Sequence, residues 1–317
     1  QVDVFWNDVD ILKRAQKKFN LDLSSVSLKP WSFGAITRAR ELSGYHAFFY
    51  MTDGSLFFST AKKNFLIIQS PDKIPDVSNF LTRARLKTWP TIICYSEFMK
   101  NIIANRMNGY SAKPLFVPVE TDLFLPGIKK NSILTVGRFF QNLHAKRHDI
   151  LIDAFKKLSP DLPRWKLVIV GSVDPGAEEY LATLKKSIGT FPIEIHTNLS
   201  FDSLVRFYKE SKIYWHGAGY GEDLEKYPEK AEHFGVTTLE AMAAGTVPIV
   251  FAGGGQKELV HEGETGYLWR EPSELITKTK DLAKNEKQRA YMQEKVVEYA
   301  SGYSIAEFGR QVHSLIE

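Results

Sequence analysis

The stretch KLVIVGSVDPGAEEYLATLKKSIGTFPIEIHT, residues 166–197, decides the fold class. Its two ends, 166–171 and 193–197, are short runs rich in Val, Ile and Leu, which are typical of buried β-strands. The residues between them, 177–189, have the pattern of a helix. Continuous apolar strands that alternate with helices predict parallel strands covered by helices on both faces.

The same alternation extends in both directions from this stretch. Towards the C-terminus and around it, strands are predicted at 132–137, 212–217, 247–252 and 265–269, and helices at 148–158, 201–211, 232–245 and 254–263. In the first part of the chain, strands are predicted at 2–6, 26–29, 46–51, 65–69, 91–96 and 115–119, and helices at 10–20, 35–42, 55–63 and 97–109. Two such blocks predict two doubly wound α/β domains, with a ligand in the cleft at the carboxyl ends of their strands.

The Pro, Gly and Lys stretch ETDLFLPGIKKNS, 120–132, predicts the domain boundary. We therefore expect a Rossmann-like N-terminal domain over 1–127 and a second over 128–300. The tail from 271 is helical in pattern, and its amphipathic last piece, 301–317, is expected to pack on the first domain. The chain begins almost at once with a strand and has no glycine-rich strand-to-helix turn in its first twenty residues, so the first domain is expected to lack its first strand-helix unit.

Composition places the chain among soluble globular proteins. It has 317 residues, of which 44% are hydrophobic and 25% charged. No apolar run reaches eighteen residues, so we expect no membrane-spanning segment and a cytoplasmic location. The single cysteine, Cys94, favours a reducing compartment and is expected to be a buried strand thiol.

Positive charge is concentrated in the first part of the chain. Residues 1–125 hold 16 Lys and Arg against 11 Asp and Glu, whereas the whole chain has a net charge of +4. The stretches LKRAQKK, 12–18, and LTRARLKTW, 81–89, mix basic and apolar residues as an amphipathic helix does. They predict either peripheral contact with an anionic membrane at the inner face or solvated helix faces. Nucleic-acid binding is disfavoured because no known binding motif accompanies the charge.

Two cations follow the strand at 132–137. Arg138 comes directly after Gly137, and Lys146 lies just before the next helix. Such a pair can clamp a diphosphate, although an exposed basic loop has the same pattern. The strand end at Gly171 is not a Walker loop, because Gly176 is followed by Ala and Glu, and no strand leads into G-x-G-x-x-G.

A second feature is EHFGVTTLEAMAAG, 232–245, where Glu232 and Glu240 flank a predicted helix start near Gly235. The N-H groups and positive dipole end of a helix start favour anions. Two carboxylates beside such a site either offset the dipole and face water, or they bind hydroxyl groups of a ligand.

Taken in order, these parts resemble the retaining glycosyltransferases of family four, whose fold is GT-B. The resemblance covers residues 131–269 and is carried by Gly137-Arg138 with Lys146, an E-x7-E motif around FG, EAMAAGTVPIV, GGGQKELV and GETGYL. The N-terminal part resembles the family more weakly, through its strand order and CYSEFMKNII. The resemblance is to the bacterial type, and it implies that 1–127 is the acceptor side and 128–300 the nucleotide-sugar side.

Carried over residue by residue, the resemblance implies a site for a nucleoside diphosphate sugar, with Arg138 and Lys146 on the diphosphate. Glu240 would accept hydrogen bonds from the ribose, and Glu232 from the donor sugar near its anomeric carbon. Eight helical positions cover about 12 Å, which suits that separation. The remaining donor-side residues, which include the amides at the helix start and the backbone near the base, would be Gly137, Gly171, Asn198, Leu199, His216, Phe234, Gly235, Val236 and Thr237.

Two positions depart from the family pattern. Where many members have a histidine, this chain has Gln69, so Asp53 or Gln69 is expected to face the acceptor. Arg147 stands where a glycine often follows the lysine, and it either adds a third cation or points outward. His216 and His233 flank the proposed sugar site as structural or donor-binding residues.

The resemblance implies a hexosyltransferase that uses a UDP- or GDP-sugar, acts on a glycan or lipid-linked acceptor in polysaccharide synthesis, and retains the α configuration. No metal or other cofactor is expected, because Arg and Lys supply the positive charge. The alternatives are a GT-B sugar-nucleotide epimerase or phosphorylase, and a non-catalytic protein that binds sugar nucleotides.

Overall fold

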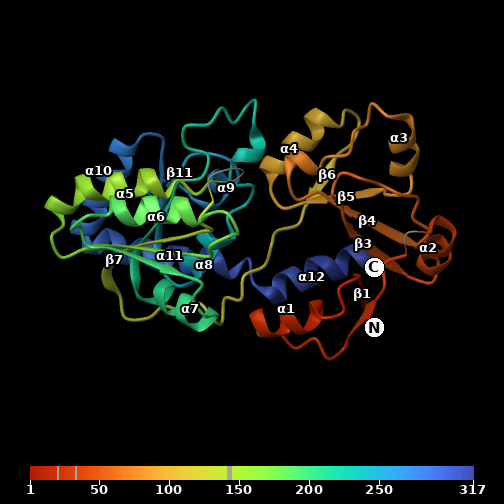
Figure 1. Ribbon diagram of the computed structural model, residues 1–317, viewed down its shortest axis with the longest axis horizontal. Helices are drawn as coiled ribbons and strands as arrows, with labels where there is room; N and C mark the ends of the chain where they lie inside the picture. The colour runs from red at the N-terminus through yellow and green to blue at the C-terminus, as the bar shows by residue number, and fades with distance from the viewer. Residues whose placement is uncertain (20, 33, 141–144) are drawn as a thin grey trace. The chain divides into compact units, whose positions relative to one another are not determined.

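The computed structural model describes residues 1–19, 21–32, 34–140 and 145–317 (Figure 1). Contacts divide the chain into two compact units. Unit 1 comprises residues 1–67 and 75–92, and unit 2 comprises residues 68–74 and 93–317. The predicted domain limits at 127 and 300 stay predictions, as does the docking of the last helix on the first domain.

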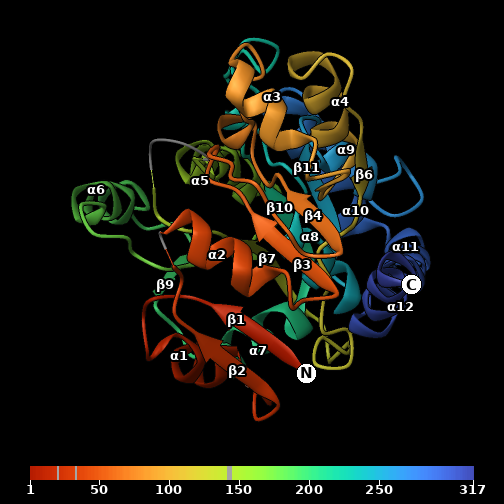
Figure 2. The same ribbon diagram turned by 90° about the vertical axis from the view of Figure 1, so that its right-hand side faces the viewer.

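Unit 1 is built from short parallel strands with helices beside them. β1 (Val2–Phe5) pairs with β2 (Val26–Lys29), and β3 (Ala47–Met51) pairs with β4 (Lys63–Ile67). α1 (Ile11–Phe19) lies beside the first pair (Figure 2). The unit also contains α2 (Ala35–Leu42), α3 (Phe80–Leu86) and the start of β5 (Thr91–Cys94). Its core is aromatic, since Phe48, Phe57 and Trp89 are each less than a tenth exposed and their rings pack together.

Unit 2 contains a six-stranded parallel sheet. In sequence order its strands are β7 (Lys130–Val136), β8 (Lys166–Gly171), β9 (Ile193–Thr197), β10 (Ser211–His216), β11 (Val247–Phe251) and β12 (Tyr267–Trp269). Their order in the sheet is β12-β11-β10-β7-β8-β9, and every neighbouring pair is parallel. The chain thus builds one half of the sheet outward from β7 and then returns to add β10 on the other side of β7.

Helices cover both faces of this sheet (Figure 1). One buried cluster joins Ile133 and Ile169 to α5 (His148–Leu158), α6 (Glu178–Ser187) and α10 (Pro272–Lys284). A second joins Leu134 and Val168 to α7 (Phe201–Glu210), α8 (Val236–Ala243) and α11 (Glu286–Ser301). Neighbouring strand residues therefore point into opposite cores, which explains why the strands are apolar throughout.

The remaining elements of unit 2 are α4 (Glu97–Arg106), β6 (Ala112–Pro114), the short α9 (Gln256–Leu259) and α12 (Ile305–Ile316). Three single-turn 3-10 helices lie at Pro71–Lys73, Ser159–Asp161 and Pro228–Lys230. The helical tail predicted from 271 onward is confirmed as α10, α11 and α12.

Two predicted elements are wrong. Residues 55–62 form no helix, because the carbonyl of Phe57 accepts a hydrogen bond from the Trp89 indole (2.9 Å) and Lys63 already begins β4. The strand predicted at 115–119 lies instead at 112–114. Pro118 cannot donate a ladder hydrogen bond, which disfavours continued pairing there.

Candidate functional site

The strand order of unit 2 creates a switch point between β7 and β10. Strands added after β7 run to one side of it, whereas β10 and its successors lie on the other. In open parallel sheets, ligands bind where the order reverses, outside the carboxyl ends of the strands. Gly137 follows β7 at this edge, and His216 is the last residue of β10. These two strand ends therefore define the place where a ligand is expected.

Three side chains meet at this edge. Lys146 Nζ lies 2.5 Å from Glu232 Oε2, and His216 Nε2 lies 3.0 Å from the same oxygen. The Lys146 and Glu232 side chains are 18% and 17% exposed, and His216 is buried. The sequence assigned these residues separately to phosphate and sugar, but the structure joins them through one carboxylate oxygen.

The electrostatics of this group keep Glu232 ionised. Burial opposes its charge, but the nearby Lys146 charge and the His216 hydrogen bond outweigh burial and hold the pKa of Glu232 well below its usual value. Burial also lowers the pKa of His216, although Glu232 acts in the other direction. At neutral pH the group is therefore a carboxylate shared by an ammonium and a neutral imidazole.

Two glycines make the close approach at the strand ends possible. A Cβ on Gly137 would lie 2.5 Å from Lys146 Cγ, so only glycine lets the lysine stem pass across the end of β7. A Cβ on Gly171 would collide with the carbonyl oxygen of Gly137. The N-H of Gly137 in turn donates to the carbonyl of Val170 (2.9 Å). The ends of β7 and β8 are thus fixed against each other.

The predicted helix start at Gly235 is confirmed. α8 begins at Val236, and Gly235 precedes it with φ 119°, a conformation that favours glycine. The amides of Phe234, Gly235 and Val236 therefore lie at the positive end of α8. The glycine-rich turn packs against this segment, because the Gly255 N-H donates to the Glu232 carbonyl (2.8 Å).

Glu240 lies on α8 and accepts a hydrogen bond from the Tyr208 hydroxyl at 2.7 Å. Burial raises the pKa of Glu240 to about 7. Thr237, one turn earlier, accepts from the Tyr214 hydroxyl at 2.8 Å. Two tyrosines from neighbouring elements therefore fix the orientation of α8 side chains at this site.

The two arginines have partners of their own. Arg138 is 57% exposed and pairs with Asp174 at 3.2 Å, so the structure does not bring it into the Lys146 group. Arg147 has φ 54°, which explains why glycine suits this position. Its guanidinium donates to the Tyr220 carbonyl and to Asp149. Because its guanidinium is already engaged, these contacts favour a structural role for Arg147 over a role as a third phosphate-binding cation.

The segment assigned to the base is held by backbone contacts. The Asn198 N-H donates to the Gly171 carbonyl (3.0 Å), and the Asn198 side chain accepts from the Val173 N-H (3.2 Å). Asn198 also has φ 53°. Leu199 packs at the edge of the core that includes α7 and α8. Asn198 therefore shapes the turn that follows β8.

The two residues assigned to the acceptor side lie in different units. Asp53 accepts from the N-H and the hydroxyl of Ser55, at 2.9 and 2.7 Å, and so supports a turn in unit 1. Gln69 is partly buried in unit 2. Their acceptor role stays a prediction.

Sequence reasoning missed the residues that join the start of α4 to α9 and to the segment 232–235. The Glu258 carboxylate accepts from the first two N-H groups of α4, those of Glu97 (2.8 Å) and Phe98 (2.5 Å). The Ser96 hydroxyl donates to the His233 carbonyl at 2.6 Å. Ser96 before Glu97 is a helix N-cap pattern that the sequence shows. The sequence does not show its contacts with His233 and Glu258, because these residues lie more than 130 positions away.

The family model described as "Glycosyl transferases group 1" matches residues 124–298. The mouse protein named GDP-Man:Man(3)GlcNAc(2)-PP-Dol alpha-1,2-mannosyltransferase is 30% identical over 168 residues, which cover 49% of this chain and 31% of that protein. An uncharacterised glycosyltransferase of Methanocaldococcus jannaschii is 26% identical over 215 residues, or 67% of this chain and 55% of that protein. The chain thus spans about a third to about half the length of these curated relatives.

Solved structures show the same fold. A glycosyltransferase of Rickettsia africae covers 99% of this chain and 89% of its own, with TM-score 0.74 and 16% identity. Anabaena HepE, solved in complex with UDP and glucose, covers 98% and 90%, with TM-score 0.70 and 15% identity. The predicted GT-B class, with two Rossmann-like domains, is confirmed. Among the residues that the structure describes, no helix has the length and apolarity to cross a bilayer.

Proposed function

The chain belongs to the group 1 glycosyl transferases, and on that premise we propose that it moves a hexose from a UDP- or GDP-sugar to a hydroxyl of a glycan or lipid-linked acceptor. In this proposal the reaction retains the α configuration at the anomeric carbon and serves glycan or glycoconjugate synthesis. One observation carries the proposal. Glu232, held by Lys146 and His216, lies at the switch point of the sheet beside the start of α8. This placement supports the proposal because a helix start favours an anion and a carboxylate beside it can accept hydrogen bonds from hydroxyl groups.

In this proposal the diphosphate binds at the start of α8, where backbone amides and the helix dipole favour an anion. Lys146 supplies positive charge from the end of β7, and Arg138 adds a second cation once it exchanges Asp174 for phosphate. Glu240 binds the ribose, and Glu232 binds hydroxyls of the transferred sugar. His216 acts through Glu232, because it is buried and bonded to that carboxylate.

The proposed reaction is a same-face displacement. The acceptor oxygen forms a bond to the anomeric carbon while the bond from that carbon to the diphosphate oxygen breaks. The acceptor proton passes to the leaving phosphate oxygen, so atoms and charge balance without a protein nucleophile. Lys146 and the amides of α8 stabilise the charge that grows on the leaving group, which is where preorganised electrostatics contribute most. We propose that this charge stabilisation needs no metal ion.

The first experiment identifies the donor. Thermal unfolding is measured with UDP-glucose, UDP-N-acetylglucosamine, UDP-galactose and GDP-mannose, because a ligand that binds only the folded state raises the melting temperature. Release of nucleoside diphosphate is then followed with candidate acceptors, with and without EDTA, and the anomeric configuration of the product is read by NMR. Failure of every donor to bind or react contradicts the proposal. An inverted product contradicts retention alone, and free nucleoside diphosphate without a glycoside product indicates an epimerase.

The second experiment tests the residues. Glu232→Gln and Lys146→Met are expected to lower kcat at least about a hundredfold, which is typical for the loss of one charge-stabilising group. Glu178→Gln is the matched control, because Glu178 also lies in the first turn of a helix but is exposed. Near wild-type turnover in either site variant would overturn these assignments.

We also propose that unit 1 contacts an anionic membrane surface from the cytoplasmic side. Just before α1, Trp6 and Val9 are 56% and 78% exposed, and α1 itself carries the exposed cations Lys13 and Arg14. Exposed apolar side chains together with Lys and Arg are typical of interfacial binding. Co-sedimentation is expected with vesicles that contain phosphatidylglycerol and not with pure phosphatidylcholine. Equal binding to both, or to neither, contradicts the proposal.

A further inference from the structure

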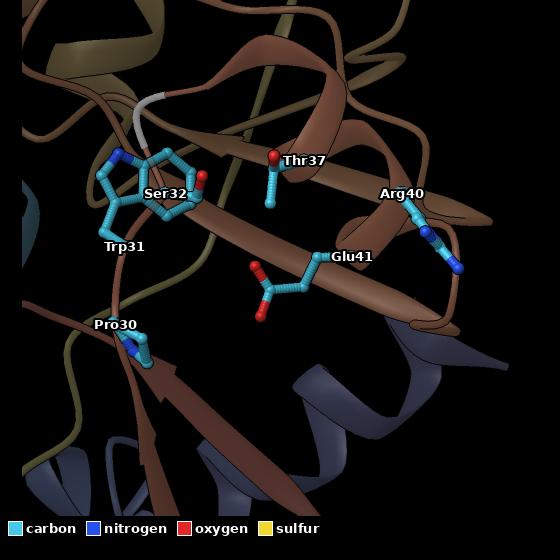
Figure 3. Close-up of a pocket in the computed structure, with 6 residues that line it drawn as sticks. All are labelled: Pro30, Trp31, Ser32, Thr37, Arg40 and Glu41. Atoms are coloured by element: carbon cyan, nitrogen blue, oxygen red, sulfur yellow. The ribbon is translucent and has the colours of Figure 1, made fainter.

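Unit 1 contains a cavity of about 590 Å³ beside α2 (Figure 3). Pro30, Trp31 and Ser32 line one side, directly after the carboxyl end of β2. Thr37, Arg40 and Glu41 line the other from α2. The volume lies within the range of about 300–1,000 Å³ that is usual for small-molecule sites. The carboxyl end of a parallel strand is also where such folds bind ligands.

Trp31 forms a rigid apolar wall of this cavity. Its backbone N-H donates to the side chain of Asn7 at 2.8 Å. Its ring is nearly parallel to those of Phe48 and Tyr50, with centroids 6.3 and 6.4 Å away, and meets the Phe57 ring edge-on at 5.3 Å. The Trp31 side chain nevertheless remains partly exposed. A fixed aromatic surface of this kind loses little conformational entropy when a ligand covers it.

Polar groups face this wall. A Cβ on Gly34 would lie 3.5 Å from Thr37 Oγ1 and 3.8 Å from Ser32 Oγ, so both hydroxyls lie near the start of α2. The Glu41 carboxylate points towards Trp31 and Ser32, whereas the Arg40 guanidinium points away (Figure 3). In the described part of the chain, the Glu41 carboxylate has no hydrogen bond or ion pair.

This lining selects a class of ligand. An unpaired carboxylate repels phosphate and other anions. Arg40 points away from it, and the Arg38 guanidinium is engaged elsewhere, since it packs on the Phe57 and Trp31 rings (4.3 and 5.4 Å) and donates to the Ser32 carbonyl (3.4 Å). A pyranose ring has an apolar C-H face, which packs on an indole ring, and hydroxyls, which donate to a carboxylate and exchange hydrogen bonds with Ser and Thr. We propose that the Trp31 cavity binds an uncharged sugar unit. That this sugar belongs to the acceptor rests on the proposed glycosyl transfer.

Binding is tested by saturation-transfer NMR on the whole protein, with the methyl α-glycosides of glucose, mannose, galactose and N-acetylglucosamine as probes. At least one glycoside is expected to receive saturation at its ring protons. Trp31→Ala and Glu41→Ala are each expected to weaken that binding at least tenfold. Glu41→Ala keeps the experiment informative if the tryptophan variant fails to fold, because Glu41 is partly exposed and forms no ion pair among the described residues.

Two controls separate this site from others. Phe80→Ala removes an exposed aromatic side chain of unit 1 outside the cavity and is expected to leave glycoside binding unchanged. Glu232→Gln removes the proposed donor-sugar contact and is also expected to leave it unchanged. The proposal is overturned if no glycoside binds, or if Glu232→Gln abolishes binding while Glu41→Ala does not. This test measures glycoside binding and is therefore independent of glycosyl transfer. If the protein binds a glycoside but transfers no sugar, only the proposed function is refuted.

Discussion

Replacing Lys146 by Met tests whether the Lys146–Glu232 pair also stabilises the fold. The two charged atoms are 2.5 Å apart, and each side chain is less than a fifth exposed. Removing one partner of a fully buried pair costs about 3–5 kcal/mol, because it leaves an uncompensated charge. Since both side chains keep some contact with solvent, we expect about 2–3 kcal/mol at pH 7. At about 2–4 °C per kcal/mol, the shift typical of domains of 150–250 residues, this corresponds to a melting temperature roughly 4–12 °C lower.

The cost should depend on pH with a definite sign. In the wild type, the pKa of Glu232 lies below its usual value, so its stabilisation is present above the ordinary glutamate pKa and is lost as pH falls through the lower folded value. Without Lys146, burial is the largest remaining influence and works to raise the pKa of Glu232. The variant then loses stability as pH rises. The difference between the two proteins should therefore grow from about pH 4 to pH 7.

The assay is chemical denaturation of the wild type, Lys146→Met, Glu232→Gln and the double variant between pH 4.5 and 8. The double variant should be less destabilised than the sum of the single ones, because the two groups interact directly. Lys157→Met is the control, since Lys157 is an exposed lysine of the same α5 region and should change stability by less than about 0.5 kcal/mol. A cost for Lys146→Met that is independent of pH, or no larger than the control's, refutes the reasoning.

Three further changes follow from the same contacts. Glu240→Gln should flatten the pH dependence of stability. Because the wild-type pKa is raised to about 7, ionising Glu240 lowers the free energy of unfolding increasingly as pH rises above the ordinary glutamate pKa. Calorimetry should therefore find that the variant gains roughly 2–3 kcal/mol of stability relative to the wild type between pH 5 and 8. An unchanged pH profile would contradict it. Glu258→Ala should cost about 1–2 kcal/mol in urea denaturation, because two N-H groups of α4 lose their acceptor, and a neutral result would show that water replaces it. Gly171→Ala should unfold the chain or cost more than about 3 kcal/mol of stability, because its Cβ would collide with the Gly137 carbonyl. Gly309→Ala is the control: this position on α12 lies in open space, so the variant should be more stable by about 0.5–1 kcal/mol. Thermal unfolding followed by circular dichroism compares the two, and similar effects would contradict the collision at Gly171.

The strands and helices of unit 2 could be predicted from the sequence because each shows a hydrophobic pattern within a few consecutive residues. Each strand is apolar throughout, since neighbouring residues such as Ile133 and Leu134 enter different cores. The helix start at Gly235 was readable for the same reason, because a glycine before a helical pattern marks the turn. The error at 55–62 arose where a distant contact decides, because the Phe57 carbonyl accepts a hydrogen bond from Trp89, 32 residues away, which no local pattern reveals. The error at 115–119 has a local cause, since Pro118 lacks the N-H that a strand ladder needs.

The candidate site was readable only in part. Motifs placed Lys146 and Glu232 at strand and helix ends, but their contact spans 86 residues and depends on β10 lying next to β7. That neighbourhood follows from the order of strands in the sheet, which periodicity does not contain. Tyr208 was missed for a related reason. Its position on α7 resembles that of any core aromatic, and only the packing of α7 against α8 brings its hydroxyl to Glu240.

The resting charges of the site bear on how a donor would bind. Both cations assigned to the diphosphate already have carboxylate partners, Glu232 for Lys146 and Asp174 for Arg138. A diphosphate therefore exchanges one anionic partner for another, and each exchange brings little net Coulomb energy. The start of α8 differs, because backbone amides form no competing ion pair and cost no side-chain ordering. In the proposed donor complex we therefore expect the amides to supply the larger share of phosphate affinity, and the displaced Glu232 to accept hydroxyls only when a sugar accompanies the phosphate. Coupling of this kind favours the complete nucleotide sugar over inorganic phosphate.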